Sequence, residues 1–198
     1  WELFLELLIE FPTGGLLIAD QLYGSFLVLA LMQQRGSHLL TRPHSSRRGR
    51  CIKRHARGDE IQAWIKPKPS QVSRPDLLIG CPERLEVRVI TQLIERRGYR
   101  TWELRIVTTL LDPHQYPATE MILLYLERWN VELDLRVLKT HYGMAPLTGK
   151  TPDIVQKEIY STMLACNCVL AVMSESGEAV RSLSHTRARQ LILMFSER

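Results

Sequence analysis

The sequence contains few cysteines and no paired cysteine motif, which argues against a disulfide framework and a zinc finger. Only four cysteines occur in 198 residues. Cys51 and His55 stand four positions apart, but no second pair of metal ligands follows them. Cys166 and Cys168 lie in an apolar segment with helical character, where buried thiols are the simplest interpretation. We therefore expect free thiols and a reducing compartment.

Long hydrophobic runs are also missing. No apolar run approaches the roughly 20 residues that a membrane-spanning helix needs, and no signal peptide is visible. We therefore expect no membrane partner. The hydrophobic content of 45% and the charged content of 24% are ordinary for a globular protein, and the length suits one domain, or one domain with an insertion.

Acidic residues are absent from one basic stretch. "RPHSSRRGRCIKRHARG", residues 42–58, contains seven Arg or Lys residues in a chain whose net charge is +5. Such a run is either a solvated loop or a loop that contacts nucleic-acid phosphates. The residues that we expect to make such contacts are Arg47, Arg48, Arg50, Lys53 and Arg54. For His55, Arg57 and Trp64, nucleic-acid contact and ordinary structural roles fit the sequence equally well.

The first part of the chain has the pattern of an α/β unit. Residues 1–11 have apolar positions at helical spacing, "LLIAD" (16–20) reads as a buried strand, 23–35 as a helix and 37–42 as a second strand. Strand, helix and strand with short connections predict a parallel pair. Asp20 would lie at the carboxyl end of the first strand, where ligands of such sheets gather.

The middle of the chain has β character and the last third has helical character. Val, Ile, Thr and Trp in partial alternation predict antiparallel strands within residues 45–111, as an insertion and not a separate domain. A helix then begins near Thr119, a plausible cap, and continues to about His141. Further helices are predicted after Pro152 and within residues 184–195.

The segment "YLERWNVELDLRVLKTHYGM", residues 125–144, carries a polar stripe on an apolar helix. At 100° per residue, five polar side chains fall within an arc of about 80°. These residues are Tyr125, Arg128, Glu132, Arg136 and Lys139. Because Arg128–Glu132 and Glu132–Arg136 are i,i+4 pairs, a solvated charged face is one interpretation. The other is a polar line that faces a ligand between two packed apolar flanks.

The spacing Y-(2)-R-(3)-E-(6)-K within this stripe resembles the signature of DDE transposases of the insertion-sequence-four family. The resemblance extends over three blocks in the family's order: residues 17–42, 105–144 and 151–170. It implies an α/β, RNase H-like (retroviral-integrase-like) fold, interrupted by a β-strand insertion before the helix that bears the catalytic Glu.

The resemblance also implies a site and its chemistry. Asp20 would be the second catalytic acid and Glu132 the third, and both would hold Mg²⁺, with Mn²⁺ as an alternative, for two-metal phosphoryl transfer. The family's DNA-binding positions correspond to Tyr125, Arg128 and Lys139, and we add Arg136 from the same stripe. Where the family usually has Arg after the second Asp, this chain has Gln21.

No segment before Asp20 fits the strand that bears the family's first Asp, because residues 1–11 read as a helix. We therefore expect an N-terminally incomplete fold, through truncation or gene decay. The expected parts are a partial core (1–44), the β insertion (45–111), the Glu helix with the helix that follows it (112–175) and a helical tail (176–198).

The expected function is that of a DNA transposase, which in its complete form cleaves and transfers strands at transposon ends. Its partners would be double-stranded DNA, both transposon ends and target, and a second copy in a homodimer. The resemblance places it in the bacterial cytoplasm, on the nucleoid. The alternative is a catalytically inactive, DNA-binding remnant of a transposase, and we expect little activity from a chain with two of the three acids.

Overall fold

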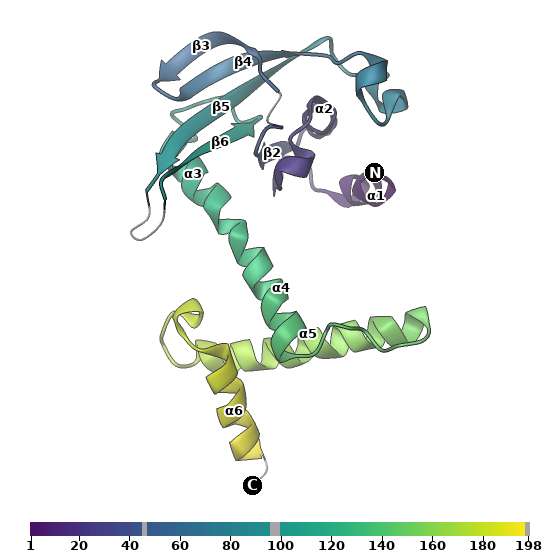
Figure 1. The fold of residues 1–198 in the computed structure, drawn as a ribbon, viewed down its shortest axis with the longest axis vertical. Coiled ribbons are helices and arrows are strands. Elements are labelled where there is room, and N and C mark those ends of the chain that lie inside the picture. The colour runs from purple at the N-terminus through teal and green to yellow at the C-terminus, as the bar shows by residue number, and fades with distance from the viewer. Residues whose placement is uncertain (45–46, 96–99, 197–198) are drawn as a thin grey trace. The chain divides into compact units, whose positions relative to one another are not determined.

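The computed structural model describes residues 1–44, 47–95 and 100–196. The protein is a mixed α/β protein with a six-stranded sheet (Figure 1). The chain divides into two compact units, Trp1–Arg128 and Trp129–Arg198, and each is described by itself. The division into four parts expected from the sequence stays a prediction.

The sheet of the first unit has the strand order β1-β2-β6-β5-β4-β3. Its strands are β1 (Leu16–Ile18), β2 (His38–Thr41), β3 (Arg50–Ala56), β4 (Asp59–Ile65), β5 (Arg84–Ile94) and β6 (Trp102–Thr108). The pair β1 and β2 is parallel, as predicted, and every other neighbouring pair is antiparallel. The strands of the expected insertion therefore extend the same sheet.

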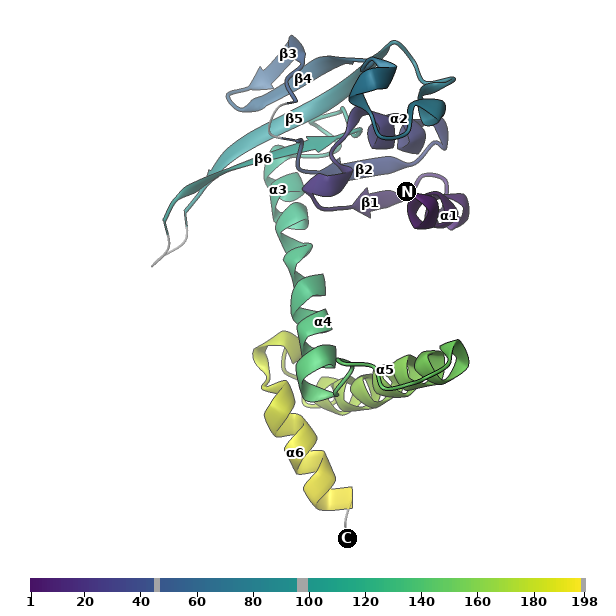
Figure 2. The ribbon, with the colours of Figure 1, turned by 45° about the vertical axis from the view of Figure 1, so that its right-hand side comes forward.

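Helices cover both faces of this sheet. The first unit contains α1 (Glu2–Glu10), α2 (Phe26–Gln34) and α3 (Ala118–Glu127), with 3₁₀ turns at Gln21–Tyr23, Pro69–Gln71 and Pro75–Leu78. Successive residues of a strand point to opposite faces. Accordingly, Leu39 packs in the cluster that contains residues of α2, whereas Leu40 packs in the cluster that contains residues of α3. Figure 2 shows these two helices beside the sheet. The core of the unit therefore consists of two apolar layers, one on each side of the sheet.

The helix α2 is apolar on nearly all sides because it is buried in the first of these layers. Residues 26–30 and Met32 are all buried. The side chain of Ser25 accepts a hydrogen bond from the Val28 N–H at 3.3 Å and so caps the first turn. This helix confirms the one expected over residues 23–35, although it begins at Phe26 and Tyr23 belongs to the preceding 3₁₀ turn.

The basic stretch contains a strand that the sequence did not reveal. Residues 42–58 were expected to form a loop, but Arg50–Ala56 is the edge strand β3. An edge strand with charged side chains lacks the apolar alternation by which strands are recognised, because little of it is buried. The β3–β4 hairpin turns at Gly58, where φ is 81° and an added Cβ would lie 2.4 Å from the Thr91 carbonyl oxygen.

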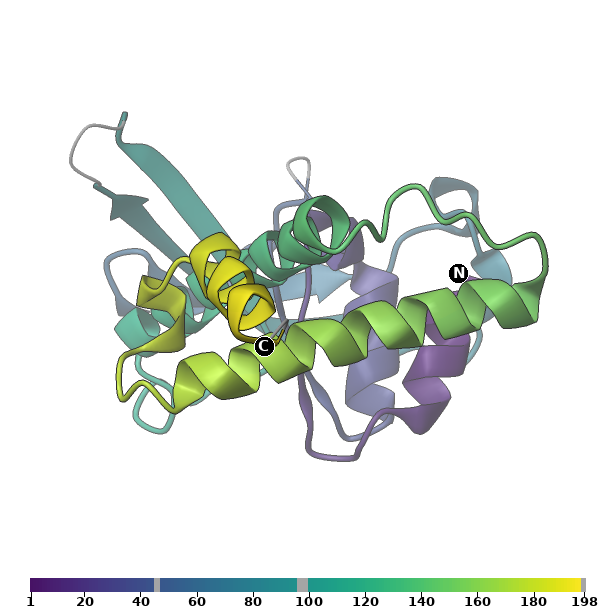
Figure 3. The ribbon, with the colours of Figure 1, turned by 90° about the horizontal axis from the view of Figure 1, so that it is seen from below.

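The second unit consists of helices. They are α4 (Trp129–His141), α5 (Pro152–Ser174) and α6 (His185–Ser196), with a 3₁₀ turn at Val180–Ser182. The longest of them is α5, against which both α4 and α6 pack (Figure 3). Thr151 caps α5 through a 3.4 Å hydrogen bond from the Ile154 N–H to its hydroxyl, and Pro152 occupies the first turn. None of the helices in the described part of the chain is long and apolar enough to cross a membrane.

Two expectations about the striped helix are wrong. It was expected as one helix, but α3 ends at Glu127 and α4 begins at Trp129, while Arg128 between them keeps helical backbone angles. Thr119 is not the cap, because the helix begins at Ala118 and Pro117 precedes it. Proline suits a helix start, since its missing N–H would have no partner within the helix there.

Candidate functional site

Asp20 lies at the carboxyl end of β1, where the sequence predicted it. Its backbone is fixed to the neighbouring strand, because the Thr41 hydroxyl donates to the Asp20 carbonyl oxygen at 2.7 Å and the Ala19 N–H donates to the Leu40 carbonyl at 3.0 Å. The side chain is exposed, and its Oδ1 accepts the Gln21 N–H at 2.6 Å. The fold thus holds this carboxylate at the sheet edge while leaving it open to solvent.

Tyr125 lies at the end of α3 and packs against the sheet with only 5% of its surface exposed. Its hydroxyl is buried and makes no hydrogen bond of normal geometry to a residue that the structure describes. Burial raises the pKa of this hydroxyl, and nearby Asp20 raises it further, whereas the charges of Arg128 and Arg42 lower it. The Arg128 guanidinium lies 5.9 Å from the centroid of the Tyr125 ring.

The first unit therefore brings Asp20, Tyr125 and Arg128 to one place, together with Arg42. Sequence reasoning did not single out Arg42 for this site. It follows β2 directly, as Asp20 follows β1 after one residue. Because the carboxyl ends of parallel strands meet at the same edge, this position was a signal that could have identified it.

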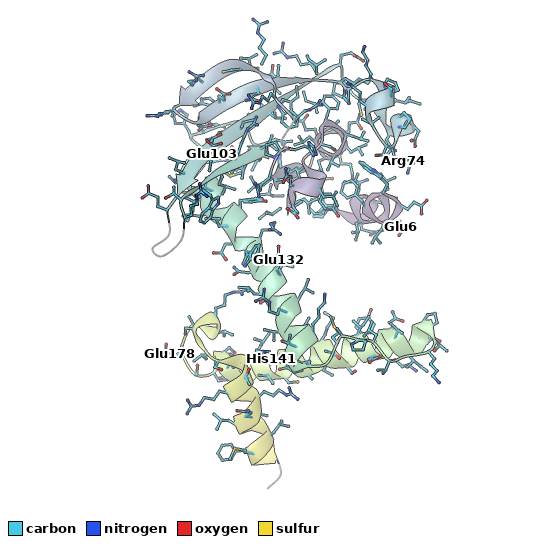
Figure 4. All side chains as sticks on the ribbon, in the orientation of Figure 1. Glu6, Arg74, Glu103, Glu132, His141 and Glu178 are labelled. Carbon is cyan, nitrogen blue, oxygen red and sulfur yellow. The ribbon has the colours of Figure 1, made fainter. Side chains whose placement is uncertain are left out.

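The remaining residues of the stripe belong to the second unit. Glu132, Arg136 and Lys139 are exposed on α4, and Figure 4 shows where Glu132 lies on that helix. The structure describes every residue of α4, and none is buried. The expectation of two packed flanks is therefore wrong for this helix, where Val131 and Leu135 are exposed.

The carboxylates fit a hard divalent cation in their chemistry. Mg²⁺ and Mn²⁺ prefer oxygen ligands, and both Asp20 and Glu132 carry exposed carboxylates. Within the described residues, no three His, Cys, Asp or Glu side chains are grouped so that they could hold a metal ion. The metal-ligand set expected from the sequence stays a prediction.

Arg47 is the most enclosed of the arginines and lysines in the basic stretch. Its guanidinium lies 5.3 Å from the Trp64 ring centroid and 5.5 Å from that of Phe26, and it donates to the Ile65 carbonyl at 3.2 Å. Burial lowers the pKa of Arg47. Trp64 is buried and donates its indole N–H to Gln62 at 3.2 Å, which confirms its structural role.

The basic residues of β3 are divided between the two faces of the sheet by its register. Arg50 pairs with Ala63 and Lys53 pairs with Ile61, so both lie on the face of these β4 residues. Arg54 pairs with Glu60 on the opposite face and forms an ion pair with it at 3.3 Å. The basic stretch therefore does not present one continuous cationic surface.

The sequence matches known proteins across most of these elements. The family described as "Transposase DDE domain" matches residues 2–168, a range that includes Asp20 and the whole stripe. Transposase InsG for insertion sequence element IS4, from Escherichia coli (strain K12), is 28% identical over 132 residues. The match covers 66% of this chain and 28% of that relative, so the chain spans well under half of its length. The family match over residues 2–168, together with the similarity to the IS4 transposase, shows that the chain belongs to the DDE transposases of the IS4 family.

Proposed function

We propose that this chain is part of a DNA transposase that cleaves and transfers strands at transposon ends. The observation that carries the proposal is the match of the family "Transposase DDE domain" over residues 2–168, a range that includes Asp20 and Glu132. The parallel β1–β2 pair with α2 between its strands supports an RNase H-like fold. The DNA of the ends and of the target is the proposed substrate, on the bacterial nucleoid, and the complete protein is proposed to act as a homodimer.

Asp20 and Glu132 are the proposed ligands of Mg²⁺ or Mn²⁺. When bound, such ions activate a water or a 3′-hydroxyl and stabilise the leaving oxygen of a phosphodiester. The exposed position of Asp20 at the strand end supports its role, because a carboxylate buried in the core could not reach a DNA phosphate. Glu132 is exposed on α4, which supports its role in the same way.

The cationic residues of the stripe are proposed to bind DNA phosphates. Arg128 presents a guanidinium fork beside Tyr125, and Arg136 and Lys139 are exposed on α4. The Tyr125 hydroxyl is a buried donor without a hydrogen-bond partner among the described residues, which supports a ligand at this position, and contact with a phosphate oxygen requires the side chain to become exposed. Arg42 adds positive charge beside the same hydroxyl.

The test is strand cleavage by the complete transposase on a plasmid that carries the transposon ends. Glu132→Gln and Asp20→Asn are each expected to abolish Mg²⁺-dependent cleavage while leaving DNA binding intact. Glu6→Gln, which removes an exposed carboxylate from α1, is the matched control and is expected to cleave normally (Figure 4). Wild-type cleavage by Glu132→Gln would contradict the proposal.

A second candidate function is DNA binding without catalysis by this chain alone. The exposed arginines of the basic stretch favour it, because they require only an anionic partner. DNA affinity is then expected to fall steeply with salt concentration and to vary little with sequence. The same affinity at low and high salt would contradict this function.

A further inference from the structure

A notch of about 730 Å³ lies at the edge of the sheet, beside the start of β3. It forms where the first residue of β3, Arg50, pairs with Ala63, so that the end of β4 extends past the edge strand. Its lining, all within the described residues, includes four arginines and no carboxylate: Arg47, Arg48, Arg50 and Arg84. The notch is therefore an open site of concentrated positive charge.

The backbone on both sides of Arg48 is fixed. Arg47 is anchored by its two aromatic contacts, and its carbonyl oxygen accepts a hydrogen bond from Arg105 Nη1 at 3.3 Å. The Gly49 N–H donates to Gln62 Oε1 at 3.1 Å, and a Cβ at Gly49 would lie 2.4 Å from the Trp64 ring. Only glycine allows this close approach, so the sequence Arg-Arg-Gly-Arg presents the guanidiniums from a preorganised backbone.

The four arginines differ in how far they are already engaged. Arg47 is held by the aromatic rings and the Ile65 carbonyl. Arg84 pairs with Glu86 at 2.8 Å, but both side chains are half-exposed, and exposed pairs are weak enough to exchange for a stronger anion. Arg48 and Arg50 are exposed, and neither forms an ion pair with any residue in the described ranges.

The surroundings of the notch carry charges of both signs. Burial lowers the pKa of Arg105 and the nearby charge of Arg48 lowers it further, whereas Glu60 and Glu103 raise it. The arginines that line the notch itself repel one another until an anion binds between them. Guanidinium groups form paired hydrogen bonds with phosphate oxygens, which suits them to a phosphodiester better than to a single spherical anion.

We propose that this arginine notch binds a phosphodiester of the DNA backbone, with Arg48 and Arg50 as the contacting residues. Arg84 is a third contact, and Arg47 is a positioning residue that holds the segment against the sheet. The proposal rests on the proposed function, since it takes DNA as the substrate. It assigns DNA contact to some arginines of the basic stretch and not to others. Arg54 takes no part because the register places it on the opposite face of the sheet from Arg50. Because the contacts are to phosphate, they carry no sequence preference.

The test measures DNA affinity of the full chain by fluorescence anisotropy with a labelled duplex over a range of salt concentrations. Arg48→Gln and Arg50→Gln are each expected to reduce the slope of log affinity against log salt by about 0.9, and the double variant by about twice that. Arg54→Gln removes the same charge from the opposite face of β3 and is expected to keep the wild-type slope. Circular dichroism checks that the variants fold.

The outcomes separate this proposal from the proposed function. A double variant with wild-type affinity and slope would overturn the proposed phosphate binding by the notch. It would leave the proposed transposase function standing, because the cleavage assay on Glu132→Gln tests that function independently. Absence of salt-dependent DNA binding by the wild-type chain would overturn the notch as well. Displacement of the duplex by polyglutamate at matched charge, or by inorganic phosphate at equal phosphate concentration, would assign the notch to an acidic peptide or a free anion and overturn its assignment to DNA.

A second measurement avoids substitutions altogether. Phenylglyoxal modifies accessible arginines, and mass spectrometry locates each modified residue in the unaltered chain. DNA is expected to protect Arg48 and Arg50 and to leave Arg54 as reactive as before. Equal modification of Arg48 and Arg50 with and without DNA would overturn the proposal.

Discussion

The two units of the chain bury their apolar side chains to very different degrees. In the first unit the sheet is covered on both faces, and Leu29 and Leu39 are completely buried. In the second unit, within the described residues, the buried apolar side chains are Cys166, Val169 and Met173. Helices that cross one another leave more surface open than a sheet covered on both sides. The comparison indicates that the first unit has a two-layered apolar core, whereas the core of the second is much smaller.

The largest effect is expected from the buried ion pair of the first unit. Arg88 is fully buried, forms two hydrogen bonds to Asp59 at 2.7 and 2.6 Å, and donates to the Tyr116 carbonyl before α3 at 2.6 Å. Arg88→Ala leaves the Asp59 charge buried without a partner, and is expected to lower the free energy of unfolding by about 3–5 kcal/mol in urea denaturation. Arg84→Ala, which breaks an exposed pair, should cost less than about 1 kcal/mol. Equal losses of unfolding free energy in the two variants would show that burial does not determine how much an ion pair stabilises this protein.

The comparison between the units can be tested directly with leucines. Leu29→Ala in α2 removes a fully buried side chain and is expected to cost about 2–5 kcal/mol. Leu164→Ala in α5 removes a side chain that is 65% exposed and is expected to change stability by less than about 0.5 kcal/mol. Thermal unfolding followed by circular dichroism measures both variants. A large loss from Leu164→Ala would show that a partner or another copy covers α5 in solution.

A smaller effect is expected at the start of α5. Thr151→Ala removes the hydroxyl that caps the Ile154 N–H and is expected to cost about 1 kcal/mol, seen in thermal unfolding. Thr119→Ala is the matched control, because Thr119 is exposed within the first turn of α3 and not at its cap. A larger loss from Thr119→Ala than from Thr151→Ala would contradict the observed helix boundaries.

The smallest effect is expected from a surface carboxylate of the second unit. The Gly149 N–H and then the groups of Thr148 donate to Glu158 and lower the pKa of its carboxyl. A carboxyl whose pKa is lower in the folded state contributes stability above its unfolded pKa of about 4.3, and this contribution is lost as the pH falls through the folded value. Amide exchange at Thr148 and Gly149, corrected for intrinsic rates, should therefore accelerate on acidification. Glu158→Gln should remove this pH dependence, whereas Glu178→Gln should preserve it.

The local pattern of the chain predicted most of its elements. The parallel pair around α2, the position of Asp20 after the first strand and the helix after Pro152 were all readable, because period, proline and capping residues act within a few positions. The strand β3 was not readable, since its charged residues show no alternation. The pair between Arg88 and Asp59 was equally invisible, because 29 positions separate them in sequence and only the β4–β5 register brings them together.

The sequence by itself determined the family of this protein and the residues of the stripe, because the spacing from Tyr125 to Lys139 is a local property of the chain. Only the tertiary structure decided which cations are available to a ligand. The basic stretch contains Arg47, Arg48, Arg50 and Arg54, yet Arg47 packs on aromatic rings and the register places Arg54 on the opposite face of the sheet from Arg50. The physical reason is that strand register and burial, and not residue type, determine whether an arginine finds its partner inside the protein or outside it.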